Sequence, residues 1–317
     1  MRVLLTGASG YVGQAVVHRL VANGVAVTAL EYRTRRRWPP AVHVRTGDLL
    51  RPAELWEAVR DVDAVCHLAA DATVRHTSAD AAELQRQVIT EGTGYLLAAM
   101  GAEAERRGVP MGLLHLSSSA VYGRAVDRPL RVTDAAEPRS SYGAAKLAAE
   151  EAIGAAAATG RIGAISLRLF NAGGRTPYGG APSPATLIHK AVAAVSGRST
   201  VLTVNGDGSA LRDFVHVCDV ATAVVAGLFR TTPATHHVHN VGATPASVLE
   251  VLAEVGRAAG RAVPVRHRAA DGMDTPYLVA DTADTRAALN WEPVSSGLPR
   301  IVTEQFEAFY DEHNSRS

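Results

Sequence analysis

The sequence is poor in several kinds of residue, and each scarcity excludes a class of protein. It has only two cysteines in 317 residues, Cys66 and Cys218, which is too few for a disulfide framework. Both lie in apolar runs, so we expect buried free thiols and a reducing, cytoplasmic location. Aromatic residues make up only 5% of the chain, which argues against stacking platforms for single-stranded nucleic acid.

Charge of one sign and long apolar runs are scarce as well. The formal net charge is +1, which provides no concentrated positive surface for nucleic acid or for an anionic membrane. No apolar run is long enough to cross a bilayer, and the first residues lack the pattern of a signal peptide. We therefore expect neither a nucleic-acid partner nor a membrane partner.

What the sequence does contain is a regular alternation of strand and helix patterns. Short apolar runs at 3–5, 25–30, 64–70, 111–116 and 165–170 are typical of strands buried on both faces, and most are separated by helical patterns. This alternation predicts an α/β protein with a doubly wound parallel sheet.

A passage rich in glycine and proline, from 173 to 184, predicts a boundary between two parts of the chain. We expect one domain over 1–171 and a smaller C-terminal α/β substrate lobe over 172–317. Part of 212–240 is expected to pack back on the first domain.

A glycine-rich turn follows the first predicted strand. Gly7, Gly10 and Gly13 stand between that strand and a helical pattern, where they let the backbone turn tightly and approach a pyrophosphate at the helix N-terminus. The second strand ends at Glu31, about where a carboxylate meets the ribose hydroxyls of an adenosine. Asp48 ends the next strand, where it could reach the adenine amino group. The pattern predicts a dinucleotide-binding domain of the Rossmann type.

The arginines after Glu31 bear on the choice of dinucleotide. Arg33, Arg35, Arg36 and Arg37 form either a solvated basic loop or a contact for the 2′-phosphate of NADP. Because Glu31 would repel that phosphate, NAD is the expected cofactor and NADP the alternative.

A second chemical signal is the spacing of Tyr142 and Lys146. On a helix these two side chains emerge on one face, a turn apart. The pKa of a phenol is about 10, and a neighbouring ammonium favours the phenolate, so the pair can serve as a general acid/base near neutral pH. Ser117, Ser118 and Ser119 follow a predicted strand upstream, at the edge where α/β sheets place their active sites.

The histidines are scattered except for His236, His237 and His239. Three imidazoles could bind a metal ion, but side chains alternate along a strand, so at most two of these share a face. We therefore expect no metal site.

Together these residues resemble a known family. The chain is similar to the extended short-chain dehydrogenase/reductases of the NAD-dependent nucleotide-sugar epimerase/dehydratase group, and closest in pattern to the UDP-glucose 4-epimerases. The matching segments run nearly from end to end, at 6–13, 47–49, 67–70, 117–123, 142–146, 168–171, 206–217 and 280–281.

The resemblance implies roles for individual residues. Tyr142 would be the acid/base, Lys146 would hold the cofactor ribose and lower the pKa of the phenol, and Ser118 would bond the reacting hydroxyl. The expected cofactor-binding residues are Gly7, Gly10, Tyr11, Val12, Gly13, Glu31, Asp48, Leu49, Leu68, Ala69, Ala70, Ser117, Tyr142, Lys146 and Phe170. The expected substrate-binding residues are Ser118, Ser119, Asn171, Thr186, Leu187, Arg212 and Asp274.

The implied reaction is the epimerisation of a nucleotide-diphosphate sugar at C4. Tyr142 would take the proton of the 4-hydroxyl as the C4 hydride passes to NAD, giving a 4-keto sugar that turns over and accepts the hydride on its other face. The resemblance also implies a homodimer, formed through the predicted helix over 81–107 and the helix that carries Tyr142.

One departure from the family pattern concerns the diphosphate. Asp271 stands where epimerases place a phosphate-binding arginine, and Met273 replaces a glycine. An acid would repel a diphosphate, so either Arg266 or Arg268 makes the contact instead, or the substrate is not a standard nucleotide-diphosphate sugar.

Two alternatives to the epimerase therefore stay open. The same site, used once per turnover, would make an NAD(P)H-dependent ketoreductase or dehydrogenase acting on a keto sugar or a related small molecule. The other alternative is a non-catalytic dinucleotide-binding protein, which would have no need of an activated phenol.

Overall fold

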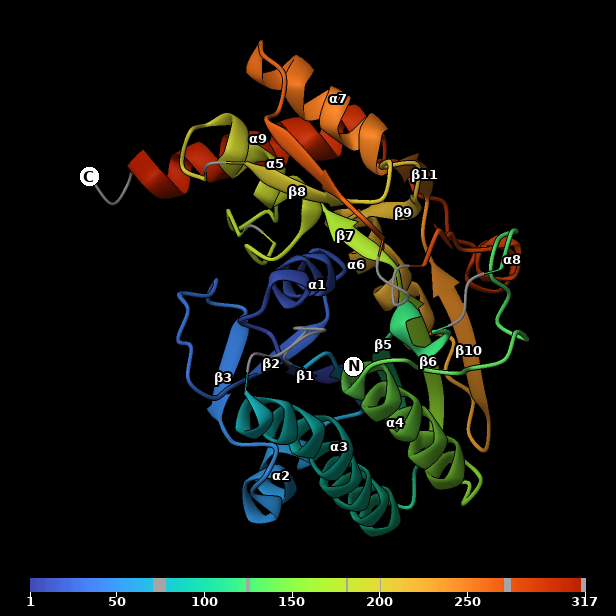
Figure 1. Ribbon diagram of the computed structural model, residues 1–317. Helices are drawn as coiled ribbons and strands as arrows, with labels where there is room; N and C mark the ends of the chain where they lie inside the picture. The colour runs from blue at the N-terminus through green and yellow to red at the C-terminus, as the bar shows by residue number, and fades with distance from the viewer. Residues whose placement is uncertain (71–77, 124–125, 181, 200, 271–274, 315–317) are drawn as a thin grey trace.

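The computed structural model describes residues 1–70, 78–123, 126–180, 182–199, 201–270 and 275–314. Its larger part is a seven-stranded sheet in which every neighbouring pair is parallel, with the order β10-β6-β5-β4-β1-β2-β3 (Figure 1). The strands are β1 (Arg2–Thr6), β2 (Ala26–Glu31), β3 (Val42–Thr46), β4 (Ala64–His67), β5 (Met111–Ser118), β6 (Ile162–Leu169) and β10 (His236–Val241). The predicted doubly wound parallel sheet is confirmed.

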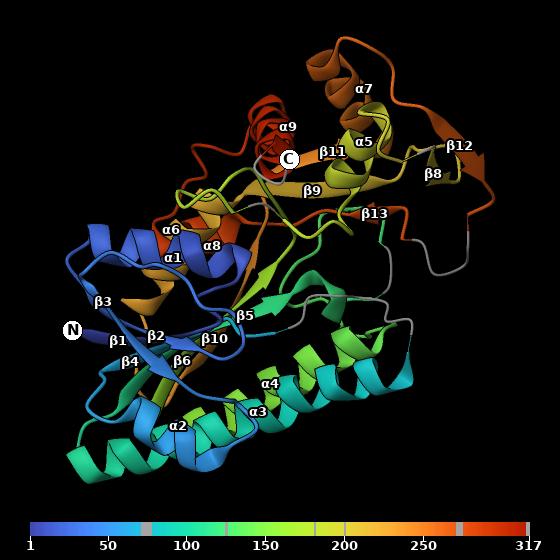
Figure 2. The ribbon, with the colours of Figure 1, turned by 90° about the vertical axis from the view of Figure 1, so that its left-hand side faces the viewer.

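Helices cover both faces of this sheet (Figures 1 and 2). One face carries α1 (Tyr11–Ala22) and α6 (Val217–Leu228), and the other carries α2 (Pro52–Val59), α3 (Ala79–Arg107) and α4 (Ser141–Ala157). Within β1, Val3 and Leu5 belong to the core under α1 and α6, whereas Leu4 belongs to the core under α2 and α3. A strand buried on both faces reads as a continuous apolar run, which explains the sequence pattern.

The smaller lobe is built on short strands and three helices. In one sheet, β9 (Leu211–His216) pairs with β7 (Asn171–Gly173), β11 (Thr244–Ser247) and β13 (Tyr277–Leu278), while β8 (Leu202–Asn205) pairs with β12 (Val265–Arg268). The helices are α5 (Leu187–Val195), α7 (Val248–Ala259) and α9 (Leu298–Asn314), which enclose a core of their own. A further helix, α8 (Ala283–Leu289), packs near β10 and α6.

The chain passes between the two parts more than once. After β9 it returns to the sheet as α6 and β10, and β10 adds an edge strand beside β6. It then leaves again for β11 and α7. Helix α7 begins with a capping box, since Ser247 Oγ accepts a hydrogen bond from the Glu250 N–H and the Glu250 carboxylate accepts one from the Ser247 N–H.

Two strand predictions need correction. The run at 64–70 was expected to be a strand throughout, but β4 ends at His67, because the Ala69 N–H beyond it donates to the Thr6 side chain rather than to a strand carbonyl. Conversely, β5 extends to Ser118, which pairs with Leu169 of β6. In the part of the chain that the structure describes, no helix combines the length and apolarity needed to cross a membrane.

Candidate active site

The glycine turn forms a cradle at the N-terminus of α1. Gly7 has a φ of +72°, and a Cβ there would lie 2.7 Å from the Ala69 nitrogen, while a Cβ at Gly13 would overlap the Gly7 carbonyl oxygen. The N-cap, Gly10, makes no side-chain capping bond, and the first turn of α1 carries no acid. The bare helix N-terminus therefore fits a pyrophosphate, and the residues present fit a dinucleotide.

Glu31 ends β2 and is held by the loop that follows it. The side chain is 2% exposed, and its Oε1 accepts hydrogen bonds from Trp38 Nε1 at 2.8 Å, the Arg36 N–H at 3.0 Å and Ser9 Oγ at 3.4 Å. All three of these hydrogen bonds, which join Glu31 to described residues, are accepted by the same oxygen, Oε1. The predicted contact of Glu31 with ribose would therefore fall to Oε2.

The arginines after Glu31 are divided in their contacts. Arg36 Nε donates to the Ser9 carbonyl oxygen at 3.0 Å, Arg35 Nη1 donates to Thr46 Oγ1 at 2.9 Å, and Arg33 lies over the ring of Tyr32. Arg35 and Arg36 thus brace the loop.

Several other residues predicted to bind the cofactor follow the ends of strands of the larger sheet. Asp48 is half-buried, and its Oδ1 accepts the Leu50 N–H at 2.9 Å. Leu49, which follows β3, and Leu68, which follows β4, are both buried. The Ala69 N–H donates to Thr6 Oγ1 at 3.3 Å.

Tyr142 and Lys146 lie on one buried face of α4, as predicted. Ser140 caps the helix by accepting the Gly143 N–H at 3.1 Å, and Tyr142 and Lys146 are 6% and 3% exposed. Lys146 Nζ donates to the Leu116 carbonyl oxygen at 2.7 Å. Burial lowers the pKa of Lys146 from 10.5 to about 8, so the ammonium still dominates at pH 7.

The turn after Lys146 carries a residue that sequence reasoning missed. Glu150 is 4% exposed and opposes the lowering of the Lys146 pKa. Its carboxylate accepts hydrogen bonds from Ser117 Oγ at 2.5 Å and Arg168 Nη2 at 2.8 Å. The Ser117 hydroxyl is thus committed to Glu150, so a cofactor contact by Ser117 would have to use its backbone. The spacing of four between Lys146 and Glu150 was the available signal.

Ser118 caps the short helix η1 (Ser119–Val121). Its Oγ accepts the Ala120 N–H at 3.2 Å, which leaves the hydroxyl proton available for a substrate oxygen. Helix α4 approaches this turn closely, since a Cβ on Gly143 would overlap the Ala120 carbonyl oxygen. The absence of a side chain at Gly143 is what lets the helix of Tyr142 touch the turn of Ser118.

Two buried histidines lie close enough to Lys146 to feel its charge. His67 Nδ1 lies 2.8 Å from Thr6 Oγ1, and its ring stacks on that of His115 with centroids 5.8 Å apart. Burial, with a smaller contribution from the Lys146 charge, lowers the pKa of His67 to about 3 and that of His115 well below its usual value. Both rings are neutral at pH 7, so the positive charge here is that of Lys146.

Four of the predicted substrate residues lie in the smaller lobe or at its first strand: Asn171, Thr186, Leu187 and Arg212. Asn171 opens β7 and donates to the Asp213 carbonyl oxygen at 2.8 Å, and Arg212 Nη1 on the paired strand β9 donates to the Thr275 carbonyl oxygen at 2.7 Å. Thr186 precedes α5, and Leu187 begins it.

Phe170, a predicted cofactor-binding residue, is 6% exposed and packs in a core cluster with Val121 and Tyr122. Asp274, with Asp271 and Met273, lies outside the described residues.

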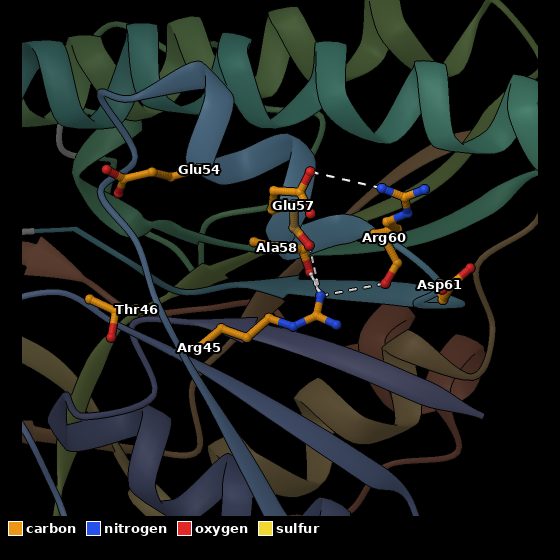
Figure 3. Close-up of a pocket in the computed structure, with 7 residues that line it drawn as sticks. All are labelled: Arg45, Thr46, Glu54, Glu57, Ala58, Arg60 and Asp61. Carbon is orange, nitrogen blue, oxygen red and sulfur yellow. Dashed lines mark hydrogen bonds and ion pairs between the residues drawn. The ribbon is translucent and has the colours of Figure 1, made fainter.

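Two other features of the structure do not contribute to the candidate active site. His236 Nε2 bonds Ser166 Oγ at 2.8 Å while the rings of His237 and His239 stack together, and within the described ranges no three ligating side chains could hold a metal ion. The recess shown in Figure 3 is lined by residues of β3 and α2. There Arg45 Nη1 donates to the carbonyl oxygens of Glu57 and Ala58, so Arg45 caps α2.

Gly143→Ala is expected to lower the free energy of unfolding by about 1–3 kcal/mol, because the added methyl must push α4 away from the Ala120 carbonyl. Gly94→Ala is the matched control, since Gly94 lies exposed in α3 with nothing within 4 Å of its Cβ position. That variant should gain up to about 1 kcal/mol from helix propensity. Equal stability of the two variants in denaturant unfolding would contradict the close approach.

Lys146→Met is expected to change how the stability of the cofactor-free protein depends on pH. The folded state holds the Lys146 proton less tightly than the unfolded chain, so folding is penalised below pH 8 and the penalty fades as the pH rises from about 8 to 10.5. The stability of the wild type relative to the variant should therefore rise by roughly 1–3 kcal/mol between pH 7 and pH 10.5. Lys190→Met, at an exposed site in α5, should leave the pH dependence of the wild type unchanged. A difference independent of pH would rule out this origin.

Comparison with known proteins agrees with this geometry. Residues 3–242 match the NAD dependent epimerase/dehydratase family. A UDP-glucose 4-epimerase from Azospirillum brasilense is 33% identical over 95% of this chain and 90% of its own length.

Two solved structures are also similar over nearly the whole chain. The UDP-glucose 4-epimerase from Brucella ovis in complex with NAD has a TM-score of 0.86 at 30% identity, covering 97% of this chain and 98% of that one. The enzyme from Stenotrophomonas maltophila, with bound NAD and formylated UDP-arabinopyranose, has a TM-score of 0.90 at 25% identity, covering 99% of each chain. The predicted family, fold and NAD cofactor are confirmed, and the chain belongs to the NAD-dependent epimerase/dehydratase family.

Proposed function

We propose that the protein epimerises a nucleotide-diphosphate sugar at C4 through a transient 4-keto intermediate. The observation that carries this proposal is the contact between α4 and the Ser118 turn at the carboxyl edge of the sheet. It gathers a phenol, a buried ammonium and a hydroxyl donor on the same edge as the glycine cradle.

The chain's residues would divide the work as follows. NAD, held at the cradle and by Glu31, would supply a reversible hydride acceptor. Tyr142 accepts the proton of the 4-hydroxyl and later returns it, while Ser118 donates a hydrogen bond to that oxygen. Lys146 stabilises the phenolate by its charge, and Glu150 helps to keep Lys146 protonated.

The remaining sequence-based assignments belong to this proposal. The first domain, 1–171, would hold NAD through the cofactor-binding residues predicted above. The lobe over 172–317 would hold the substrate, with Asn171 and Arg212 at its diphosphate. The names of the relatives support a UDP-sugar, since the Stenotrophomonas enzyme is described with a UDP-pentose bound.

The test is conversion of UDP-glucose, UDP-galactose and UDP-arabinopyranose, followed by NMR without any added reductant. We expect the C4 epimer to form, and Tyr142→Phe to lose at least about 100-fold in rate because the general acid/base is removed. Tyr310→Phe, on the exposed side of α9, is the matched control and should keep full activity.

Two results would contradict the proposal. Steady NADPH consumption with a 4-keto sugar and no epimer would identify a ketoreductase instead. Undiminished epimerisation by Tyr142→Phe would refute the assigned acid/base.

We propose in addition a homodimer formed through α3 and α4, which lie side by side on one face of the molecule (Figure 1). Leu84 and Tyr95 are 43% and 36% exposed on one stripe of α3. Light scattering should report twice the chain mass for the wild type and a monomer for Tyr95→Glu. Phe229→Glu, at an exposed position on the other face of the sheet, should stay dimeric; a wild-type monomer would refute the proposal.

A cytoplasmic location is part of the same proposal. It is supported by two free thiols, one buried at Cys66 and one half-buried at Cys218.

A further inference from the structure

Three segments distant in the sequence meet on the outer face of α1. Tyr178, in the segment after β7, lies edge-on to two rings: Trp38 at 5.7 Å and His18 of α1 at 5.8 Å between centroids. Figures 1 and 2 show this yellow-green segment passing over α1 on the side away from the sheet. A loop of the substrate lobe thus packs against the loop that follows Glu31.

The segment is tied to the helix of the glycine cradle by buried hydrogen bonds. Thr176 Oγ1 donates to Gln14 Oε1 at 3.2 Å, and Gln14 Nε2 donates to the Gly10 carbonyl oxygen at 3.2 Å. Tyr11 Oη donates to the Gly174 carbonyl oxygen at 2.8 Å. Gln14 and Thr176 are 1% and 3% exposed, so these bonds are shielded from water.

Trp38 connects this contact to the end of β2. Its Nε1–H donates to Glu31 Oε1 at 2.8 Å, and its ring packs against Tyr178. A carboxylate that is 2% exposed depends on such donors for its orientation, because a buried acceptor without a partner is costly. Tyr178 therefore limits the movement of Trp38, and Trp38 limits that of Glu31.

We propose that Trp38 and Tyr178 are positioning residues that hold the Glu31 carboxylate toward the adenosine ribose, so that the substrate lobe slows the release of NAD. This inference rests on the proposed role of Glu31 in NAD binding. Because an epimerase regenerates NAD within each turnover, it gains from retaining the cofactor rather than exchanging it. Aromatic contacts of about 1 kcal/mol and a hydrogen bond to a charged group can supply the restraint.

The experiment measures the rate at which preloaded protein exchanges bound NAD for isotopically labelled NAD. Trp38→Phe keeps a ring but removes the N–H donor, and Tyr178→Ala removes the packing. We expect each variant to release NAD about 10-fold faster. Trp38→Phe loses a hydrogen bond to a charged group, and Tyr178→Ala removes the ring that keeps Trp38 in place for that bond. Tyr178→Phe keeps the ring and should behave as the wild type. So should Trp56→Phe, which alters an exposed tryptophan on α2.

A double-mutant cycle separates positioning from packing. If Trp38 acts through Glu31, then Trp38→Phe should change the Kd for NAD little in a Glu31→Gln background, since the carboxylate it orients is gone. An equal effect of Trp38→Phe in both backgrounds would overturn the proposal, as would wild-type exchange rates for Trp38→Phe and Tyr178→Ala.

The outcome is independent of the sugar reaction, because exchange and binding of NAD are measured without substrate. Faster release by the two variants in a protein that forms no epimer would uphold this inference and defeat the proposed reaction. Unchanged release in a protein that does form epimer would do the reverse.

Discussion

The buried ammonium of Lys146 is the group on which the rest of the candidate site depends. It is anchored to the Leu116 carbonyl oxygen of β5, and Glu150, one turn further along the helix, opposes the lowering of its pKa by burial. Glu150 in turn binds Ser117 and Arg168, so the same carboxylate that supports the charge also pins the end of the strand that leads to Ser118. Electrostatics and strand geometry are therefore coupled through one residue.

The two parts of the molecule cooperate because the chain crosses between them. The larger sheet takes its edge strand β10 and the helix α6 from sequence that follows the first strands of the smaller lobe. In turn, the segment of the smaller lobe after β7 covers α1, the helix of the larger part that follows the glycine cradle. The helix that carries the glycine cradle is thus held by residues of both parts of the molecule.

Much of this arrangement follows from local sequence. The glycine turn and the spacing of Tyr142 and Lys146 are signals within a few residues, and the structure forms both of them where predicted. The end of β4 was misjudged because it depends on the bond between the Ala69 N–H and the Thr6 side chain, a contact between residues 63 positions apart. The contact of Trp38 with Tyr178 joins residues 140 positions apart, and no local periodicity announces such a pair.

The position of β10 limits where the chain can be truncated and how its substrate lobe could be exchanged. A fragment ending near residue 171 would leave the hydrogen-bonding edge of β6 open and the apolar face of α1 stripped of α6. Open edges of that kind recruit other strands and promote aggregation. The sheet is therefore no detachable module, although the sequence reads as two parts. Exchange of substrate lobes between relatives would have to graft the lobe around α6 and β10, as one insertion before α6 and one segment after β10.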